Sequence, residues 1–130
     1  MGSSILIVDD DAGICQFLET VLTKAGYKTT VATDGNQAVA AVRHEPFDVI
    51  ILDLFMPGKA GFQTISVLRL QSRAKVIAIS GGGRFPAGDS LLIASRLRAH
   101  ATLAKPFTPS QLLDVVRHLL STSRTEENAA

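Results

Sequence analysis

The stretch Val49-Ile50-Ile51-Leu52-Asp53 decides the fold of this chain. Four aliphatic residues in a row, three of them β-branched, predict a strand that is buried on both faces, as in the middle of a parallel sheet. A carboxylate at the end of such a strand loses hydration energy unless a charged group compensates it. Ligands of open α/β sheets bind at the carboxyl ends of the strands. Asp53 therefore either caps a loop or takes part in chemistry.

Length and composition limit the class of protein. The chain has 130 residues, of which 46% are hydrophobic and 19% charged, and this balance predicts one soluble domain without long disordered segments. A formal net charge of +1 argues against a surface dedicated to nucleic acid or membrane. The single cysteine, Cys15, cannot form an internal disulfide, and no apolar stretch reaches the ~20 residues of a membrane span. We expect a cytoplasmic protein with a buried thiol and no direct contact with nucleic acid or membrane.

The apolar periodicity predicts strands and helices in strict alternation. Strands are expected at 4–8, 28–32, 48–52, 75–79 and 101–104, and helices at 12–25, from 34 toward 45, at 61–71, 89–98 and from 109 to about 120. Five strands and five helices with short connections predict an α/β fold, a doubly wound parallel sheet covered on both faces. The pattern fills residues 1–121 as one domain, and the polar residues 122–130 are expected to form a disordered tail.

Capping residues mark several of the predicted helix ends. Asp11 and Asp34 are placed to accept hydrogen bonds from the first backbone amides of their helices, and Gly26 is a typical helix stop. The segment Thr108-Pro109-Ser110-Gln111 matches a capping box with proline at the first helical position. These signals support the assigned boundaries.

Polar residues follow four of the predicted strands. They are the cluster Asp9-Asp10-Asp11, then Asp53, Ser80 and Lys105. Right-handed crossovers place these strand ends on one edge of the sheet. Carboxylates that converge without histidine or cysteine suit Mg²⁺ or Mn²⁺ and not zinc. A hydroxyl and an ammonium can hold two oxygens of a phosphoryl group, and a carboxylate can accept that group, so the set predicts phosphoryl transfer to Asp53.

The chain resembles the response-regulator receiver domain of two-component signalling, of the chemotaxis-regulator kind, over roughly residues 4 to 121. The matching pieces are Ile5-Leu6-Ile7-Val8-Asp9-Asp10-Asp11, Val49-Ile50-Ile51-Leu52-Asp53-Leu54-Phe55-Met56-Pro57-Gly58, Val76-Ile77-Ala78-Ile79-Ser80-Gly81 and Leu103-Ala104-Lys105-Pro106-Phe107. Each piece alone is weak, whereas all four in this order are specific. The resemblance implies a flavodoxin-like fold with strand order 2-1-3-4-5.

The resemblance also implies a metal site and its partners. Asp53 becomes the acceptor of a phosphoryl group from a sensor histidine kinase or a histidine phosphotransfer protein. Asp10 binds Mg²⁺ directly, with Mn²⁺ as a substitute, and Asp9 acts beside it through water. The backbone carbonyl of Phe55 is the expected third protein ligand. The domain is then no enzyme in the usual sense, although it promotes its own phosphotransfer and dephosphorylation.

Two further residues complete the set that the resemblance implies. Ser80 takes the position of the switch hydroxyl, and Lys105 takes that of the lysine that pairs with a phosphoryl oxygen. The Lys105-Pro106 bond is cis in the family, which directs the lysine into the site. Phosphorylation is expected to shift the face formed by the fourth helix, the fifth strand and the last helix, and so to signal an unknown output protein.

The chain departs from the family at two places. Many receivers carry an aromatic residue three positions before the lysine, but this chain has Thr102 there, so no aromatic switch is expected. Phe55 lies two residues after the acceptor, and we hypothesise that its ring hinders the attacking water and lengthens the life of the aspartyl phosphate.

Other interpretations stay open. The aspartates at 9–11 could only begin a helix, Ser80 could be a turn residue, and Lys105 a surface lysine. No output domain follows the last helix, so we expect a stand-alone regulator, the alternative being an excised N-terminal receiver of a DNA-binding regulator or hybrid kinase. A haloacid-dehalogenase-like phosphatase would need a first-strand Asp-x-Asp-x-Thr motif, but the segment Asp9-Asp10-Asp11-Ala12-Gly13 lacks the final hydroxyl. A flavodoxin would need a hydroxyl-rich phosphate loop where this chain has three aspartates.

Overall fold

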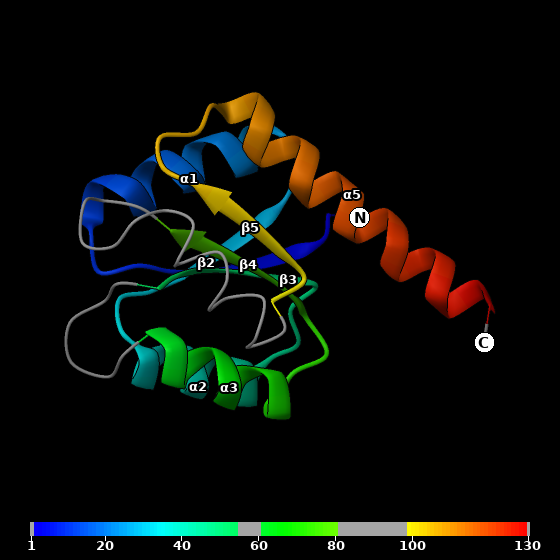
Figure 1. The fold of residues 1–130 in the computed structure, drawn as a ribbon, viewed down its shortest axis with the longest axis horizontal. Helices are drawn as coiled ribbons and strands as arrows, with labels where there is room; N and C mark the ends of the chain where they lie inside the picture. The colour runs from blue at the N-terminus through cyan, green and yellow to red at the C-terminus, as the bar shows by residue number, and fades with distance from the viewer. Residues whose placement is uncertain (1, 55–60, 81–98, 130) are drawn as a thin grey trace.

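The structure is a computed structural model that describes residues 2–54, 61–80 and 99–129, with the backbone alone described at 61–63, 80 and 123–129. Five strands form one parallel sheet in the order β2-β1-β3-β4-β5, which confirms the predicted topology (Figure 1). The strands are β1 (Ser4–Val8), β2 (Lys28–Ala32), β3 (Val49–Asp53), β4 (Lys75–Ser80) and β5 (Ala101–Ala104).

Helices cover both faces of this sheet. They are α1 (Ala12–Lys24), α2 (Gly35–His44), α3 (Gly61–Gln71) and α5 (Pro109–Ala129). Figure 1 shows α1 and α5 on one face and α2 and α3 on the other. The helix expected at 89–98 lies outside the described residues. No helix in the described part of the chain is long and apolar enough to cross a membrane.

Alternation along β3 explains why the sheet is covered on both sides. Every residue of β3 is buried. Ile51 belongs to the apolar cluster under α1 and α5, whereas Ile50 and Leu52 belong to the cluster under α2 and α3. A strand at the centre of two cores needs apolar residues at successive positions. The apolar run that predicted this strand therefore carries both cores, and Asp53 is where the run ends.

The capping predictions are confirmed. The Asp11 carboxylate accepts hydrogen bonds from the amides of Gly13 at 2.8 Å and Ile14 at 3.2 Å, and Asp34 accepts one from Gln37 at 2.8 Å. At the start of α5 the side chains of Thr108 and Gln111 each accept a bond from the other's backbone amide, at 3.1 and 2.8 Å. Gly26 follows α1 with φ of +97°, the left-handed conformation that favours glycine.

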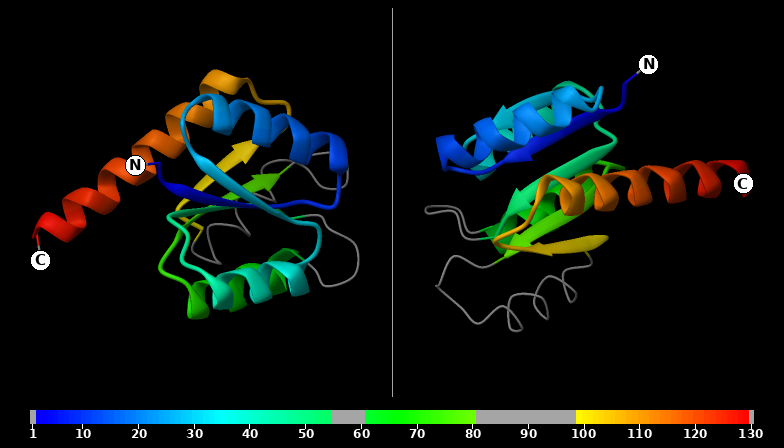
Figure 2. Two further views of the ribbon diagram at one scale, coloured as in Figure 1. Left: turned by 180° about the vertical axis from the view of Figure 1, so that it is seen from behind. Right: turned by 90° about the horizontal axis from the view of Figure 1, so that it is seen from above.

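Some boundaries differ from the sequence prediction. Strand β3 is shifted by one residue to end on Asp53, and β4 extends to Ser80. The largest difference concerns α5, which was expected to end near Leu120 but is helical to Ala129 (Figure 2). Extending an established helix is easier than nucleating one, and this polar segment contains helix-forming Arg and Glu. The helix therefore extends beyond its expected end, while the domain limit at 121 and the disordered tail from 122 stay predictions.

Candidate functional site

The ends of three strands bring three carboxylates and one ammonium together. Val8 pairs with Leu52 across β1 and β3, so Asp9 and Asp53 leave neighbouring strands side by side. Asp10 joins them, and one carboxylate oxygen from each of the three lies within 4.8 Å of the others. Lys105 directly follows β5, and its peptide bond to the next residue, Pro106, is cis. The Nζ of Lys105 lies 3.6 Å from Oδ2 of Asp53. The predicted convergence of these four residues is confirmed.

Asp9 is the most constrained member of this cluster. Its side chain is 1% exposed, and its Oδ1 accepts a hydrogen bond from the backbone amide of Asp11 at 2.9 Å. Its Oδ2 is buried and has no hydrogen-bond partner among the residues that the structure describes. An unpaired carboxylate oxygen in a buried position is costly unless an ion or water occupies the place in front of it. The unpaired oxygen therefore indicates where a cation belongs.

The electrostatics of Asp9 agree with this interpretation. The pKa of Asp9 is raised to about 6, chiefly by burial and also by the charges of Asp53 and Asp10, against the opposing effects of the bond from the Asp11 amide and the charge of Lys105. Three carboxylates against one ammonium leave two formal negative charges when all are ionised. A hard divalent cation with oxygen ligands fits both the donor set and the charge. Asp9, Asp10 and Asp53 are the described residues that could hold it.

Two other predicted site residues are described only in part. Ser80 is the last residue of β4 and pairs with Ala104, next to Lys105, so its backbone lies between the acidic residues and the lysine. Its side chain lies outside what the structure describes. Phe55, the expected carbonyl ligand, also lies outside the described residues.

The sequence did not reveal that Cys15 supports the acidic cluster. The thiol was expected to be buried, which the structure confirms, but its Sγ also donates a hydrogen bond to the backbone carbonyl of Asp9 at 3.3 Å. Burial, and after it the charge of Asp9, raise the pKa of Cys15 to about 11. Cys15 and Asp9 come together because the first turn of α1 packs against the end of β1. Their separation of six positions in the sequence does not predict this contact.

An apolar pocket beside Lys105 was also missed. It has a volume of about 440 Å³, and its walls come from the start of α1 and the segment after β5, namely Asp11, Gly13, Ile14, Phe17, Lys105, Pro106 and Phe107. The rings of Phe17 and Phe107 lie 6.1 Å apart at 54°, and Phe17 is 39% exposed. Phe17 occupies an apolar position in the helical periodicity of α1, and this pattern does not indicate that its ring borders the open surface next to the site.

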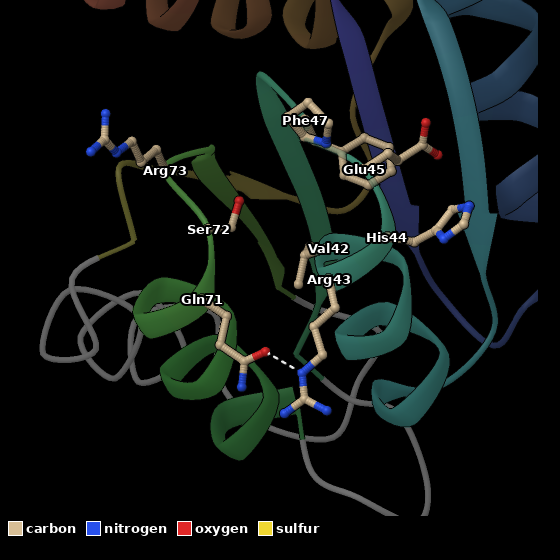
Figure 3. Close-up of a pocket in the computed structure, with 9 residues that line it drawn as sticks. Val42, Arg43, His44, Glu45, Phe47, Gln71, Ser72 and Arg73 are labelled. Atoms are coloured by element: carbon tan, nitrogen blue, oxygen red, sulfur yellow. Dashed lines mark hydrogen bonds between the residues drawn. The ribbon is translucent and has the colours of Figure 1, made fainter.

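A second pocket, of about 320 Å³, lies at the opposite edge of the sheet, between the ends of α2 and α3 (Figure 3). Arg43 Nε donates to Gln71 Oε1 at 2.7 Å. Figure 3 shows Arg73 and His44 pointing away from the Arg43–Gln71 pair and from each other. Cationic residues at helix C-termini also stabilise the helix dipoles. This pocket therefore lacks the convergent polar groups that mark the carboxyl edge as the functional site.

Comparisons with known proteins agree with this geometry. The sequence pattern of the response regulator receiver domain matches residues 5–117. The DNA-binding response regulator MtrA of Mycobacterium tuberculosis is 35% identical over 119 residues, which cover 90% of this chain and 50% of MtrA. This chain spans about half the length of the curated relatives it matches.

Solved structures give the same result. The chemotaxis protein CheY4 of Vibrio cholerae superposes with a TM-score of 0.82 and 30% identity, over 92% of this chain and 99% of CheY4. The receiver domain of the sensor histidine kinase PA1611 from Pseudomonas aeruginosa superposes with a TM-score of 0.82 and 26% identity, over 93% of this chain and 99% of that domain. The PA1611 structure has a magnesium ion coordinated in its active-site cleft.

Proposed function

Because this chain belongs to the response regulator receiver domain family, we propose that it accepts a phosphoryl group on Asp53 from the phosphohistidine of a sensor histidine kinase or a histidine phosphotransfer protein. The observation that carries the proposal is the convergence of Asp9, Asp10, Asp53 and Lys105 at one edge of the sheet. A carboxylate acceptor, an acidic metal site and a lysine are what phosphoryl transfer to aspartate needs.

In the proposed reaction an ionised oxygen of Asp53 attacks the phosphorus of the donor phosphohistidine. A new O–P bond forms, the P–N bond of the donor breaks, and the imidazole leaves with the electron pair of that bond. The Nζ of Lys105, now 3.6 Å from Asp53, pairs with a phosphoryl oxygen, and the hydroxyl of Ser80 donates to another. The protein's contribution is mainly to position these groups and neutralise charge.

We assign the metal site to Asp10 and Asp53, with Asp9 acting through water and the backbone carbonyl of Phe55 as a further ligand. The buried, unpaired Oδ2 of Asp9 and the two excess negative charges support this assignment. Mg²⁺ suits the oxygen donors, and Mn²⁺ is the expected substitute. When bound, the ion offsets the negative charge that the phosphoryl oxygens bring to the carboxylates. The same residues would serve hydrolysis of the aspartyl phosphate, so the domain promotes both its own phosphorylation and its own dephosphorylation.

The donor is expected to dock over the pocket of Ile14, Phe17 and Phe107. This pocket is lined mostly by apolar groups and borders Lys105, so a protein seated on it reaches the acceptor carboxylate. Exposed aromatic residues beside a reactive site are typical of protein contacts. Asp11 at the rim contributes the charged edge.

The phosphorylated domain would then signal through the face that includes β5 and α5. Thr102 on β5 is half-buried and replaces the aromatic residue of many receivers, so Ser80 and the adjacent backbone would carry the change. We propose a partner protein as reader of a stand-alone regulator. The similarity to half of the DNA-binding regulator MtrA supports the alternative, a receiver segment of a longer regulator. The genomic reading frame distinguishes the two.

Incubation with acetyl phosphate and Mg²⁺, followed by intact mass measurement, tests the proposal. The wild-type protein should gain one phosphoryl group, and Asp53→Asn should gain none. Asp34→Asn is the matched control, because Asp34 caps α2 away from the acidic cluster. A phosphoryl adduct on both the wild type and Asp53→Asn would contradict the assignment of the acceptor. Release of phosphate from small phosphate esters would instead favour the phosphatase alternative.

A further inference from the structure

His100 makes an unusual contact at the start of the edge strand β5. Its backbone amide donates to the carbonyl of Val76 at 2.9 Å, and its ring atom Nδ1 accepts a hydrogen bond from the amide of Val76 at 2.9 Å. The ladder between β4 and β5 begins one residue later, with Ile77 opposite Ala101. One residue therefore satisfies both backbone groups of Val76 at the point where the strand pairing starts.

The ring must be neutral to make this contact. A backbone amide only donates, so Nδ1 needs its lone pair, and an imidazolium ring has none. A cationic group also lies beside the ring, because Nη1 of Arg69 on α3 is 3.0 Å from Nδ1 and 2.9 Å from Nε2. A guanidinium is permanently charged and cannot accept. A proton on Nδ1 would therefore face the Val76 amide hydrogen and add a positive charge beside the Arg69 guanidinium.

Arg69 from α3 places a positive charge in contact with the ring. Protonation would place a further positive charge beside Arg69 and remove the bond to Val76. Val76 is 1% exposed, so water does not readily replace that bond.

The position of the contact links it to the proposed reaction. β5 is a four-residue edge strand that pairs with β4 alone, and Lys105 follows it directly. His100 and Lys105 thus lie at the two ends of β5, about 16 Å apart at ~3.3 Å per residue. A short strand paired on one side has few bonds to hold its register. The contact of His100 extends the pairing of β5 with β4 by one position and therefore helps to hold β5 in register.

We propose that His100, as a neutral imidazole, is a positioning residue that anchors the start of β5 and, through that strand, the backbone at Lys105. The anchor holds at neutral pH and is released when the ring takes up a proton. The link to Lys105 rests on the proposed phosphoryl transfer, whereas the anchor does not. An asparagine can replace the ring, since its Oδ1 accepts the same bond and does not titrate in this range.

Urea unfolding of the metal-free protein at pH 7.5 and pH 5.0 tests the anchor. At pH 7.5 the wild type and His100→Asn should unfold at the same urea midpoint, and His100→Ala at a lower one. At pH 5.0 the wild type should fall toward His100→Ala, while His100→Asn stays above it. Asp9 and the other titrating groups are common to all three proteins, so their contributions to the pH dependence of unfolding cancel in the comparison. His44→Asn, at an exposed position, should give no pH-dependent difference.

Two further measurements separate the anchor from its consequence. Replacing Arg69 by methionine should raise the pH at which the His100 ring titrates in NMR spectra. The rate at which acetyl phosphate phosphorylates the wild type, divided by the rate for His100→Asn, should fall severalfold between pH 7.5 and 5.5.

An unfolding difference between wild type and His100→Asn that is the same at both pH values would overturn the anchor. A constant rate ratio beside a pH-dependent unfolding difference would overturn the link to Lys105. Loss of phosphorylation in every protein would contradict the proposed function and leave the unfolding test decisive.

Discussion

The Nζ of Lys105 lies 3.6 Å from Oδ2 of Asp53, although the strands that carry them are not neighbours. β4 lies between β3 and β5, so the lysine crosses the end of β4, where Ser80 is the last residue. The Asp53 side chain is 8% exposed and that of Lys105 24%. The ammonium is therefore a counter-charge for the buried carboxylate, and in the proposed reaction it pairs with a phosphoryl oxygen.

Replacing Lys105 by methionine should slow phosphorylation by acetyl phosphate about 100-fold, the usual cost of removing one group that stabilises developing charge. Mg²⁺ binding should be kept or become tighter, because the ion no longer competes with an ammonium beside Asp53. Intact mass against time and fluorescence or calorimetric titration with Mg²⁺ measure the two effects. Lys24→Met, at the exposed end of α1, is the control. Equal phosphorylation of Lys105→Met and Lys24→Met would show that the lysine has no role in transfer.

Asp9 should make the stability of the metal-free protein depend on pH. Its pKa is raised to about 6 from 3.8. The folded state therefore holds this proton more tightly than the unfolded chain, so the associated stability is present below about pH 4 and is lost as the pH rises through 6. About two pKa units correspond to about 3 kcal/mol in free energy of unfolding.

Urea unfolding with a chelator between pH 4 and 7.5 measures this loss. Asp9→Asn should remove it, since a neutral amide has no ionised form to destabilise the native state. Mg²⁺ should restore stability to the wild type above pH 6 and have a smaller effect on the variant, which keeps Asp10 and Asp53 but lacks the Asp9 charge. A pH dependence that is the same in both proteins would show that burial of Asp9 is not its cause.

Cys15 should be almost unreactive in the folded protein. Its thiol is buried, 5% exposed, and its pKa is raised to about 11. At pH 8 the thiolate fraction is then about 100-fold below that of a thiol with a pKa of 9, and thiolate is the form that reacts. Alkylation with iodoacetamide, followed by mass spectrometry, should be slow in buffer and fast in urea. Rapid modification in buffer would mean that α1 opens readily from the Asp9 carbonyl.

The sequence predicted the fold and the four charged site residues because both depend on strong local signals. An apolar run such as 49–52 suits only a central strand, and a polar residue after each strand must fall on one edge of the sheet. Contacts that depend on how elements pack could not be predicted. Three contacts are of this kind: that of Cys15 with Asp9, that of Phe17 with Phe107 and that of His100 with Val76. In each, the sequence position of one residue does not indicate its partner. The length of α5 was missed because helix propagation overrides a lack of apolar residues.

Phe55 is the last residue to test, since it follows the acceptor by two positions and lies outside the described residues. We predict that Phe55→Asn shortens the life of the aspartyl phosphate, because an amide leaves room for water and can orient it, whereas a phenyl ring excludes it. The wild type and variant are phosphorylated with acetyl phosphate, freed of it by rapid desalting, and followed by intact mass. Phe55→Leu is the matched control, apolar like phenylalanine, and should stay close to the wild type. An unchanged or slower loss of phosphate from Phe55→Asn would contradict the hypothesis, and equal acceleration in both variants would assign the effect to ring size instead of polarity.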